Sequence, residues 1–331
     1  MRRRIGRKER KKQKKILIIG SISLLLFLCV GYAAFSTNLS LTAKGNIKEL
    51  QASELLRKKC NTTTGDGLYK DEYEEGRCIY KGANPDNYIT FNNETWRIIS
   101  VEADNTIKII KNGIITDMSF DSKGYRDDTS NGVGGTYCTH GSNGCNAWSI
   151  SNNFSDGNYT GTVLKDAELN TYLNEIYYNT ITETNKRLIA NHTWGIGAAV
   201  YQNDDLANQV KSEKEITWKG NIGLITASDY IRANTNTEQC GNLSIASNNS
   251  TICVTTNWIQ SVVSTATQPF IWTITPIDTN QRDVYIIYPN GNISGGYATA
   301  NIGSVAPSLY LSSDITLLGK GAENNPYIIT N

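Results

Sequence analysis

The sequence offers few of the residues on which enzyme chemistry depends. It contains only two histidines, His140 and His192, among 331 residues. Nucleophilic catalysis needs a nucleophile, a base and an orienting group within reach of one another. His192 follows a predicted short helix, where packing or capping is the usual role, and His140 lies in a glycine-rich loop. We therefore expect a protein that is not an enzyme, with an extracellular enzyme of unknown type as an alternative.

Motifs for bound cofactors are missing as well. Residues 195–197 (Gly-Ile-Gly) lack the third glycine and the strand–helix setting of a dinucleotide loop. Residues 278–283 contain aspartate and asparagine, but lack the glycine and the closing glutamate of an EF-hand calcium loop. The sequence thus predicts no cofactor and no metal site.

Excess positive charge is confined to the amino-terminal end. Residues 1–15 contain ten lysines or arginines and one acid, Glu9, a balance of +9. The whole chain has 32 basic and 31 acidic residues, so the remainder holds 22 basic against 30 acidic residues, a balance of −8. Nucleic acid binding needs clustered cations. We expect the body of the chain not to bind nucleic acid.

An apolar segment follows the basic residues directly. Residues 16–34 contain no charge over nineteen positions, the length that a helix needs to cross a bilayer. The positive-inside rule places residues 1–15 in the cytoplasm as a basic tail and everything from residue 35 outside. Small residues before a possible cut after Ala33 would also suit signal peptidase, which would release a secreted protein. We favour an uncleaved signal-anchor in the cell membrane, a stalk at 35–59 and an extracellular domain at 60–331.

The cysteines predict disulfide bonds in the extracellular part. Cys29 lies in the predicted span, and the other six follow it. An even number of cysteines in an oxidising compartment favours disulfides, and proximity in sequence favours local pairing. The predicted pairs are Cys60–Cys78, Cys138–Cys145 and Cys240–Cys253. Zinc is the alternative at Cys138, His140 and Cys145, but a fourth ligand is missing nearby, so a disulfide is preferred.

The apolar pattern predicts strands at both ends of the extracellular part and helices between them. A helix is expected at 165–178, where residues 169, 172, 173, 176 and 177 fall on one helical face, and residues 96–101 and 106–110 flank a short turn. Further strands are expected at 270–274 and 284–288, and further helices near residue 182 and at 228–233, the last capped by Ser228. Trp96, Trp272 and Tyr310 are expected to pack in the core. Without a repeating strand–helix alternation, this order indicates an α+β fold.

A series of short motifs carries a family resemblance over about residues 65–331. The motifs are Asp66–Tyr69, Tyr80–Pro85, Phe91–Val101, Gly223–Arg232, Trp272–Pro276, Pro307–Leu311 and Gly319–Ile328. In this order they resemble a Firmicute surface ectodomain family of unknown function. The carboxyl-terminal half resembles the C-type-lectin-like fold, in the branch shared with formylglycine-generating enzymes and the Fibrobacter major-paralogue domain. The resemblance implies a transmembrane helix followed by a lectin-like ectodomain rich in strands and long loops.

The sequence also departs from these relatives. Ala306-Pro307 stands where the family commonly has Arg-Pro, and the Glu-Pro-Asn signature of true C-type lectins is absent. Cys253 is the last cysteine, so the paired carboxyl-terminal cysteines that bind copper in formylglycine-generating enzymes are missing. The resemblance therefore implies a fold, and neither a lectin nor an oxidase activity.

The candidate ligand site lies in the loops between the last strands, where lectin-like folds usually bind. These loops are residues 276–283 and 289–303, and loops on a stiff scaffold are a common place for recognition. The side chains there that are best suited to directional or stacking contacts are Arg282, Asp283, Tyr288 and Tyr297. The sequence thus favours a membrane-anchored cell-surface protein that serves as a non-catalytic binding or adhesion module. Its expected partner is a carbohydrate or protein at the envelope, and a secreted structural matrix component is the alternative.

Overall fold

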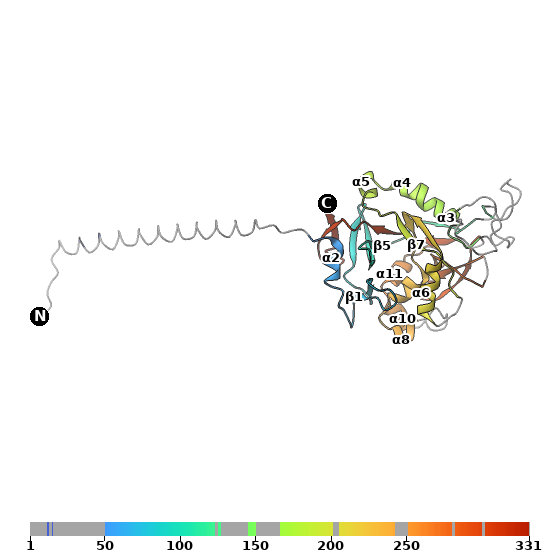
Figure 1. Ribbon diagram of the computed structural model, residues 1–331, viewed down its shortest axis with the longest axis horizontal. Coiled ribbons are helices and arrows are strands. Elements are labelled where there is room, and N and C mark those ends of the chain that lie inside the picture. The colour runs from blue at the N-terminus through green and yellow to red at the C-terminus, as the bar shows by residue number, and fades with distance from the viewer. Residues whose placement is uncertain are drawn as a thin grey trace. The chain divides into compact units, whose positions relative to one another are not determined.

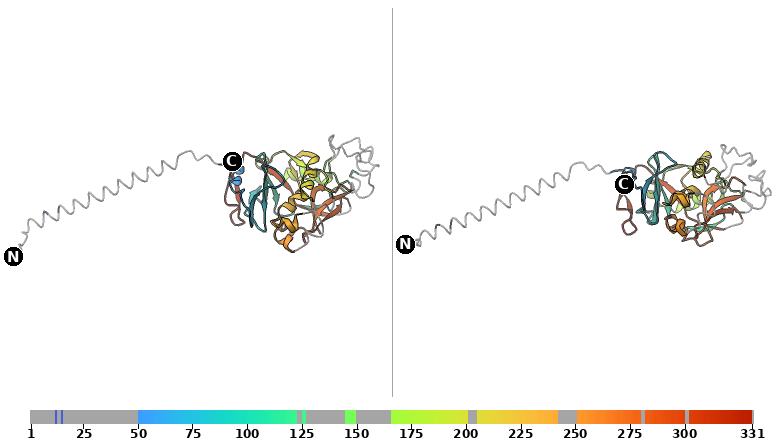
Figure 2. Two further views of the ribbon diagram at one scale, coloured as in Figure 1. Left: turned by 60° about the horizontal axis from the view of Figure 1, so that its bottom comes forward. Right: turned by 90° about the horizontal axis from the view of Figure 1, so that it is seen from below.

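The computed structural model describes residues 12, 15, 50–122, 125–126, 145–149, 166–200, 205–241, 251–279, 282–299 and 302–330. The chain divides into two compact units, Met1–Glu49 and Leu50–Asn331. In the first unit, Lys12 and Lys15 are described, and both are helical. The second unit mixes helices with several sheets and is rich in strands (Figures 1 and 2). The predicted α+β class is confirmed at this level.

The predicted membrane span falls on residues that the structure does not describe. Residues 16–34 and the possible cleavage site after Ala33 both lie outside the described ranges. Within those ranges, no helix is both long enough and apolar enough to cross a bilayer.

The largest sheet joins the beginning of the second unit to its end. Its main path runs β15-β16-β3-β4-β5-β14-β9, and β2 attaches to β4 and carries β1. The strands are β1 (Gly67–Lys70), β2 (Cys78–Lys81), β3 (Tyr88–Phe91), β4 (Glu94–Val101), β5 (Ile107–Lys111), β9 (Ile222–Gly223), β14 (Ser308–Leu311), β15 (Thr316–Leu318) and β16 (Tyr327–Thr330). The late strands β14 and β16 pair with the early strands β5 and β3. The predicted hairpin at 96–110 is confirmed as β4–β5.

A second sheet is built mainly from the last third of the chain. Its order is β12-β11-β10-β13-β6, and a separate pair joins β7 to β8. The strands are β6 (Thr116–Met118), β7 (His192–Gly195), β8 (Thr217–Gly220), β10 (Ile271–Pro276), β11 (Asp283–Ile287), β12 (Ile293–Tyr297) and β13 (Gly303–Val305). The predicted strands at 270–274 and 284–288 correspond to β10 and β11. Gly291 has φ 86°, a left-handed conformation that suits glycine in the turn between β11 and β12.

Short helices connect the sheets. They are α2 (Ala52–Arg57), α3 (Glu168–Thr171), η3 (Tyr172–Tyr177), α4 (Tyr178–Thr180), α5 (Glu183–Lys186), α6 (Leu206–Glu215), α7 (Ala227–Arg232), α8 (Thr237–Cys240), α10 (Thr251–Thr255) and α11 (Ile259–Val263). Helix α2 lies in the segment predicted as a stalk, and it buries Ala52 and Leu56. It lies beside β15, because the Ala52 N–H donates to the Ile315 carbonyl at 2.8 Å.

The predicted helix at 165–178 forms, but its apolar face differs from the prediction. The middle of it, η3, is a π-helix, in which the Tyr178 N–H donates to the Leu173 carbonyl five residues earlier. The wider turn shifts the positions that follow it away from the α-helical phase. Leu169 and Leu173 are buried as predicted, whereas the side chain of Ile176 is 59% exposed.

Helix α7 has a different cap from the one predicted. Thr226, and not Ser228, is the N-cap, because its hydroxyl accepts from the Asp229 N–H at 3.0 Å. The Asp229 carboxylate in turn accepts from the Thr226 N–H at 3.1 Å, which completes a capping box. Ser228 is the second residue of the helix and donates to a buried carboxylate described below.

The core is continuous between the two large sheets. Strand β4 is buried from Trp96 to Val101 on both of its faces, as expected where other elements cover a sheet on each side. Trp96, Trp272 and Tyr310 are buried, which confirms the predicted packing roles. The core therefore fixes β2, β4, β5 and α7, which carry or directly adjoin most of the charged residues described below.

Candidate functional site

Two of the predicted disulfides are present. Cys60 and Cys78 are joined with their Cα atoms 6.0 Å apart, and Cys240 and Cys253 with theirs 5.5 Å apart. Cys138 lies outside the described residues, so the Cys138–Cys145 pair stays a prediction. Disulfides form and persist in oxidising compartments. The two bonds therefore indicate an extracellular or otherwise oxidising location for this part of the chain.

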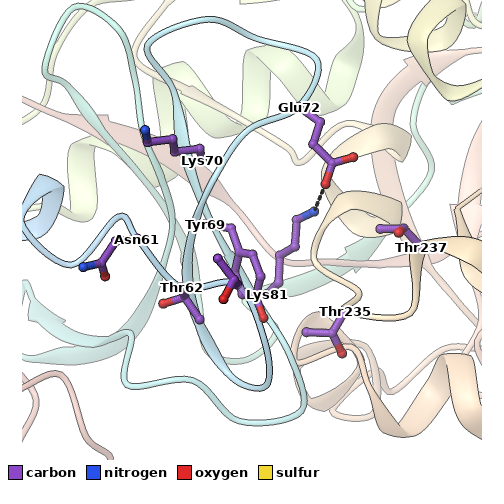
Figure 3. Close-up of a pocket in the computed structure, with 9 residues that line it drawn as sticks. Asn61, Thr62, Tyr69, Lys70, Glu72, Lys81, Thr235 and Thr237 are labelled. Atoms are coloured by element: carbon purple, nitrogen blue, oxygen red, sulfur yellow. Dashed lines mark hydrogen bonds and ion pairs between the residues drawn. The ribbon is translucent and has the colours of Figure 1, made fainter.

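A polar pocket of about 540 Å³ opens between the two disulfide-linked regions (Figure 3). Its lining residues are Asn61, Thr62, Thr63, Tyr69, Lys70, Glu72, Lys81, Thr235 and Thr237. We refer to it as the Lys81 pocket. Every lining side chain carries a hydroxyl, amide or charged group, and none is a purely aliphatic side chain. The carbon atoms of these threonine, tyrosine and lysine side chains nevertheless supply more of the exposed lining than their nitrogen and oxygen atoms, so the surface offers both hydrogen bonds and apolar contact.

Each wall of the Lys81 pocket is fixed by one disulfide. Asn61–Thr63 directly follow Cys60, and Cys78 begins the strand β2 that ends at Lys81. On the other side, Thr237 begins α8, which ends at Cys240. The two segments that supply most of the lining are thus covalently restrained close to their pocket residues. A restrained site loses less conformational entropy when it binds a ligand.

A backbone contact holds the two walls together. The Gly82 N–H donates to the Ala233 carbonyl at 3.0 Å, which links the end of β2 to the segment that leads into Thr235 and Thr237. Gly82 has φ 117°, and a Cβ atom there would lie 2.2 Å from Oδ1 of Asp66. Only glycine fits this position. The conformation of the loop after Lys81 therefore depends on the glycine at position 82 as well as on hydrogen bonds.

Lys81 is the buried cation of this pocket. Its side chain is held on the face of β1 and β2 that also carries Tyr69, and its Nζ lies 5.5 Å from the Tyr69 ring centroid. The residue is only 3% exposed. Among the residues that the structure describes, its one carboxylate contact is with Oε1 of Glu72 at 3.5 Å, and the Glu72 side chain is 61% exposed (Figure 3). In Figure 3 Lys70 points away from Lys81, as the alternation of side chains along a strand requires.

Tyr69 forms the uncharged part of the Lys81 environment. Its hydroxyl donates to the Gly65 carbonyl at 2.5 Å. Burial, and secondly the negative charge of Asp66, raise the pKa of Tyr69. The phenol therefore stays protonated at neutral pH and presents its ring to the ammonium group.

A second group of buried charges lies deeper in the same unit. It consists of three cations and four carboxylates, Arg77, Lys108, Arg232, Asp71, Glu74, Glu102 and Asp229, and we refer to it as the Arg77 cluster. Arg77 contacts Glu102 at 3.0 Å, Asp229 at 2.9 Å and Asp71 at 2.8 Å. Arg232 shares Asp71 at 2.8 Å, and Lys108 contacts Asp229 at 2.7 Å. The cavity beside the cluster measures only about 50 Å³.

The pairing in the Arg77 cluster overrides the effect of burial on its acids. Burial alone would raise the pKa of Asp229, but Lys108, Arg77 and Arg232 lower that pKa far below its usual range. Likewise, burial opposes the charge of Glu74, whereas Arg77, Arg232 and a hydrogen bond from Lys214 hold the pKa of Glu74 at about 2. These carboxylates are therefore charged at neutral pH and satisfied by neighbouring cations.

Glu213 is a buried acid of a different kind. It accepts from the Ser228 N–H at 3.1 Å, from the Ser228 hydroxyl, and from the Thr275 hydroxyl at 2.9 Å. Burial, together with the nearby charge of Asp229, raises the pKa of Glu213. Neutral donors thus surround this carboxyl group, which ties α6, α7 and β10 together.

His192, the described histidine, is held by packing and hydrogen bonds. Its ring stacks on Tyr310 with 3.8 Å between centroids. Its Nε2 lies 3.0 Å from Oδ2 of Asp104, and its Nδ1 lies 2.8 Å from the Thr193 carbonyl oxygen. Both ring nitrogens thus face acceptors, so a neutral ring can donate to only one of them, whereas a protonated ring can donate to both. His140 lies outside the described residues.

The four predicted ligand-binding residues lie on one hairpin but at two ends of it. Asp283 and Tyr297 are paired across β11 and β12, and the guanidinium carbon of Arg282 is 5.0 Å from the Tyr297 ring centroid. Tyr288 follows the other end of β11, where its ring contacts Phe270 at 5.9 Å. The structure therefore brings Arg282, Asp283 and Tyr297 together and separates Tyr288 from them. A binding role for these residues stays a prediction.

The Lys81 pocket was not predicted from the sequence. Its acid, its cation and its threonines come from segments that are up to 176 positions apart, between Asn61 and Thr237. A usable signal was present, since short polar segments adjoin both disulfides. No protein family, no curated protein and no solved structure matches the chain.

Proposed function

We propose that this chain is a membrane-anchored cell-surface protein whose outer part is a non-catalytic module that binds envelope carbohydrate in the Lys81 pocket. The observation that carries the proposal is the open polar pocket between two disulfide-restrained segments. Its volume of about 540 Å³ lies in the range of small-molecule sites. Its lining of hydroxyl and amide groups matches a ligand that is itself rich in hydroxyl groups.

Two features favour this proposal over an extracellular enzyme or a protein-binding surface. The ring of His192 stacks on Tyr310 and both of its nitrogens face protein acceptors, so the histidine that the structure describes is engaged within the fold. Protein interfaces have a buried core of aromatic and apolar side chains. The Lys81 pocket offers Tyr69 alone in that role. A concave polar site suits a sugar better than a protein surface.

The finer fold assignment belongs to the same proposal. The resemblance to the C-type-lectin-like fold agrees with a strand-rich α+β unit, although the predicted loop at 289–303 contains strand β12. The hairpin that carries Arg282 and Tyr297 would then offer a second contact for a long carbohydrate chain. It stays a second candidate, because its aromatic ring is already engaged by Arg282.

A bulky residue in the pocket tests the proposal. Thr237 lines the Lys81 pocket, whereas Thr255 is exposed on α10 outside it. We expect Thr237→Trp to abolish sedimentation of the full chain, held in lipid nanodiscs, with purified envelope polysaccharide. Thr255→Trp is the matched control and should sediment like the wild type. Equal sedimentation of both variants would contradict the proposal, and sedimentation of the wild type without polysaccharide would support a self-assembling matrix protein.

The predicted membrane topology has a separate test. Protease added to intact cells should remove the part of the chain after residue 35, because the +9 tail places the amino terminus inside. Protection of that part, with loss of an amino-terminal tag, would reverse the topology. Recovery of the chain in the medium, cut after Ala33, would replace the anchor by a cleaved signal.

A further inference from the structure

Lys81 is buried, as a structural charge would be, but its contact with a carboxylate is as weak as that of an ion pair at the protein surface. An ammonium group has three N–H donors, and a buried charge without close partners is costly. The described partners of Lys81 are the Tyr69 ring and one carboxylate oxygen of Glu72 at 3.5 Å. That distance is long for a charge-assisted hydrogen bond, which typically measures about 2.7–2.9 Å. Lys81 therefore keeps donors available toward the pocket.

Glu72 is placed so that its carboxylate can move away from Lys81. It lies in the connection between β1 and β2, and its side chain is 61% exposed. An exposed carboxylate that makes one long contact loses little when that contact breaks. Its only described contact with the pocket is the one to Lys81. The position next to Lys81 therefore holds a weakly bound negative group in the present structure.

We infer that Lys81 binds a negatively charged group of a sugar ligand, a carboxylate or a phosphate, and that Glu72 occupies this position when no ligand is bound. The inference rests on the proposed carbohydrate-binding function. The anionic group replaces Glu72 and forms short hydrogen bonds with the ammonium. Thr235 and Thr237, which line the same pocket, supply hydroxyls for the sugar ring. Glu72 thus competes with the ligand and screens Lys81 against neutral sugars.

The competition gives the two side chains opposite effects on affinity. Lys81→Met keeps the length of the side chain and removes its charge. It should weaken binding of an anionic sugar about tenfold or more, since a charge-assisted hydrogen bond is lost. Glu72→Gln removes the competing charge and should strengthen binding several-fold. A purely structural Lys81–Glu72 pair would give two variants that change in the same direction.

The experiment is a calorimetric titration of the full chain in nanodiscs with glucose, glucuronate and glucose 6-phosphate. The two charged sugars distinguish a carboxylate from a phosphate ligand. We expect at least one of them to bind more tightly than glucose, and this preference should fall with rising salt concentration. The controls are Lys186→Met and Glu183→Gln. Lys186 has the same kinds of partner, Glu183 at 2.7 Å and the Tyr178 ring at 5.0 Å, outside the pocket.

The outcomes separate this inference from the proposed function. The inference of an anionic ligand is wrong if Lys81→Met binds the charged sugars as tightly as the wild type does, or if Glu72→Gln binds them more weakly. Equal affinity for all three sugars would also contradict the anionic ligand. The proposed carbohydrate binding would still stand, provided that Thr237→Trp abolishes it. If none of the three binds while envelope polysaccharide still does, the inference is wrong and the proposed function stands. If Lys81→Met does not fold, Glu72→Gln decides alone, because it leaves Lys81 in place.

Discussion

The Lys81 pocket and the Arg77 cluster both bury cations, but they differ in the number and distance of the carboxylates around each cation. Arg77 has four carboxylates within 3.4 Å, and three of them are shared with a second cation at 2.8 Å or closer. Lys81 has one carboxylate at 3.5 Å on a mostly exposed side chain. The space beside the cluster measures about 50 Å³, against about 540 Å³ beside Lys81. The cation with more carboxylate partners therefore has less open space beside it, and the cation with fewer partners has more.

The difference separates two roles that burial alone would confuse. A buried ion pair with complete partners fixes the arrangement of its elements, and breaking it is costly because a charge is left behind. A buried charge with incomplete partners beside open space is a candidate for function. The Arg77 cluster joins β2, β4, β5 and α7 in the first way. Lys81 fits the second description.

Removal of Arg77 should give the largest effect. Arg77→Met leaves Asp71, Glu102 and Asp229 without their common cation. We expect the free energy of unfolding to fall by about 3–5 kcal/mol, the usual cost of breaking a buried pair. Lys81→Met is the counterpart and should cost less than about 1 kcal/mol, because its only ion pair is long and half solvated. Urea unfolding monitored by tryptophan fluorescence measures both, and equal losses would remove the distinction.

Removal of one disulfide should come next. Replacing Cys60 and Cys78 with serine opens a loop of 18 positions. We expect a loss of about 3 kcal/mol, mainly because the unfolded chain gains freedom. Affinity for envelope polysaccharide should fall as well, since Asn61–Thr63 lose their restraint. The Cys240→Ser/Cys253→Ser variant should behave in the same way, and a variant with unchanged affinity would show that the disulfides do not shape the pocket.

Acid should weaken the Arg77 cluster. The fold holds the pKa of Glu74 at about 2, below its ordinary value of 4.5. Its stabilisation is complete above pH 4.5 and is lost as the pH falls from 4.5 toward 2, by about 2 kcal/mol after allowance for partial exposure. Glu74→Gln should flatten the fall in unfolding free energy over this range. Glu213→Gln is the control, because burial raises the pKa of Glu213 and this residue stays protonated throughout the window.

The two tyrosines of the hairpin should give the smallest effects, and unequal ones. Tyr288 packs on Phe270, so Tyr288→Ala should cost about 1–2 kcal/mol of unfolding free energy. Tyr297 is 41% exposed, so Tyr297→Ala should change stability by less than about 0.5 kcal/mol. If Tyr297→Ala weakens carbohydrate binding more than Thr237→Trp does, the hairpin is the main ligand site and the Lys81 pocket is not.

Local signals in the sequence predicted much of the fold. The apolar strand pairs gave β4–β5 and β10–β11, and cysteine proximity gave two disulfides. The helix at 165–178 forms at the predicted residues, but its buried face differs from the predicted face, because a π-helical turn leaves no clear mark on the apolar pattern. The Thr226–Asp229 capping box was readable from its spacing, yet Ser228 was preferred as the cap.

Contacts between distant segments could not be predicted in this way. The pairing of β16 with β3, the contact of His192 with Asp104 and the placement of Lys81 and Thr237 around one pocket depend on how the sheets assemble. No local period or spacing specifies these contacts. The fold resemblance therefore places the predicted ligand residues on the last loops, whereas the pocket lies where the first strands meet α8.

The most direct test of the account measures stability and affinity on one variant, Lys81→Met. If Lys81 is kept for a ligand, unfolding free energy should stay within about 1 kcal/mol of the wild type. Affinity for the anionic sugar that binds the wild type should fall about tenfold or more in the same preparation. A stability loss of about 3 kcal/mol or more with unchanged affinity would contradict the account, because Lys81 would then be a structural charge like Arg77.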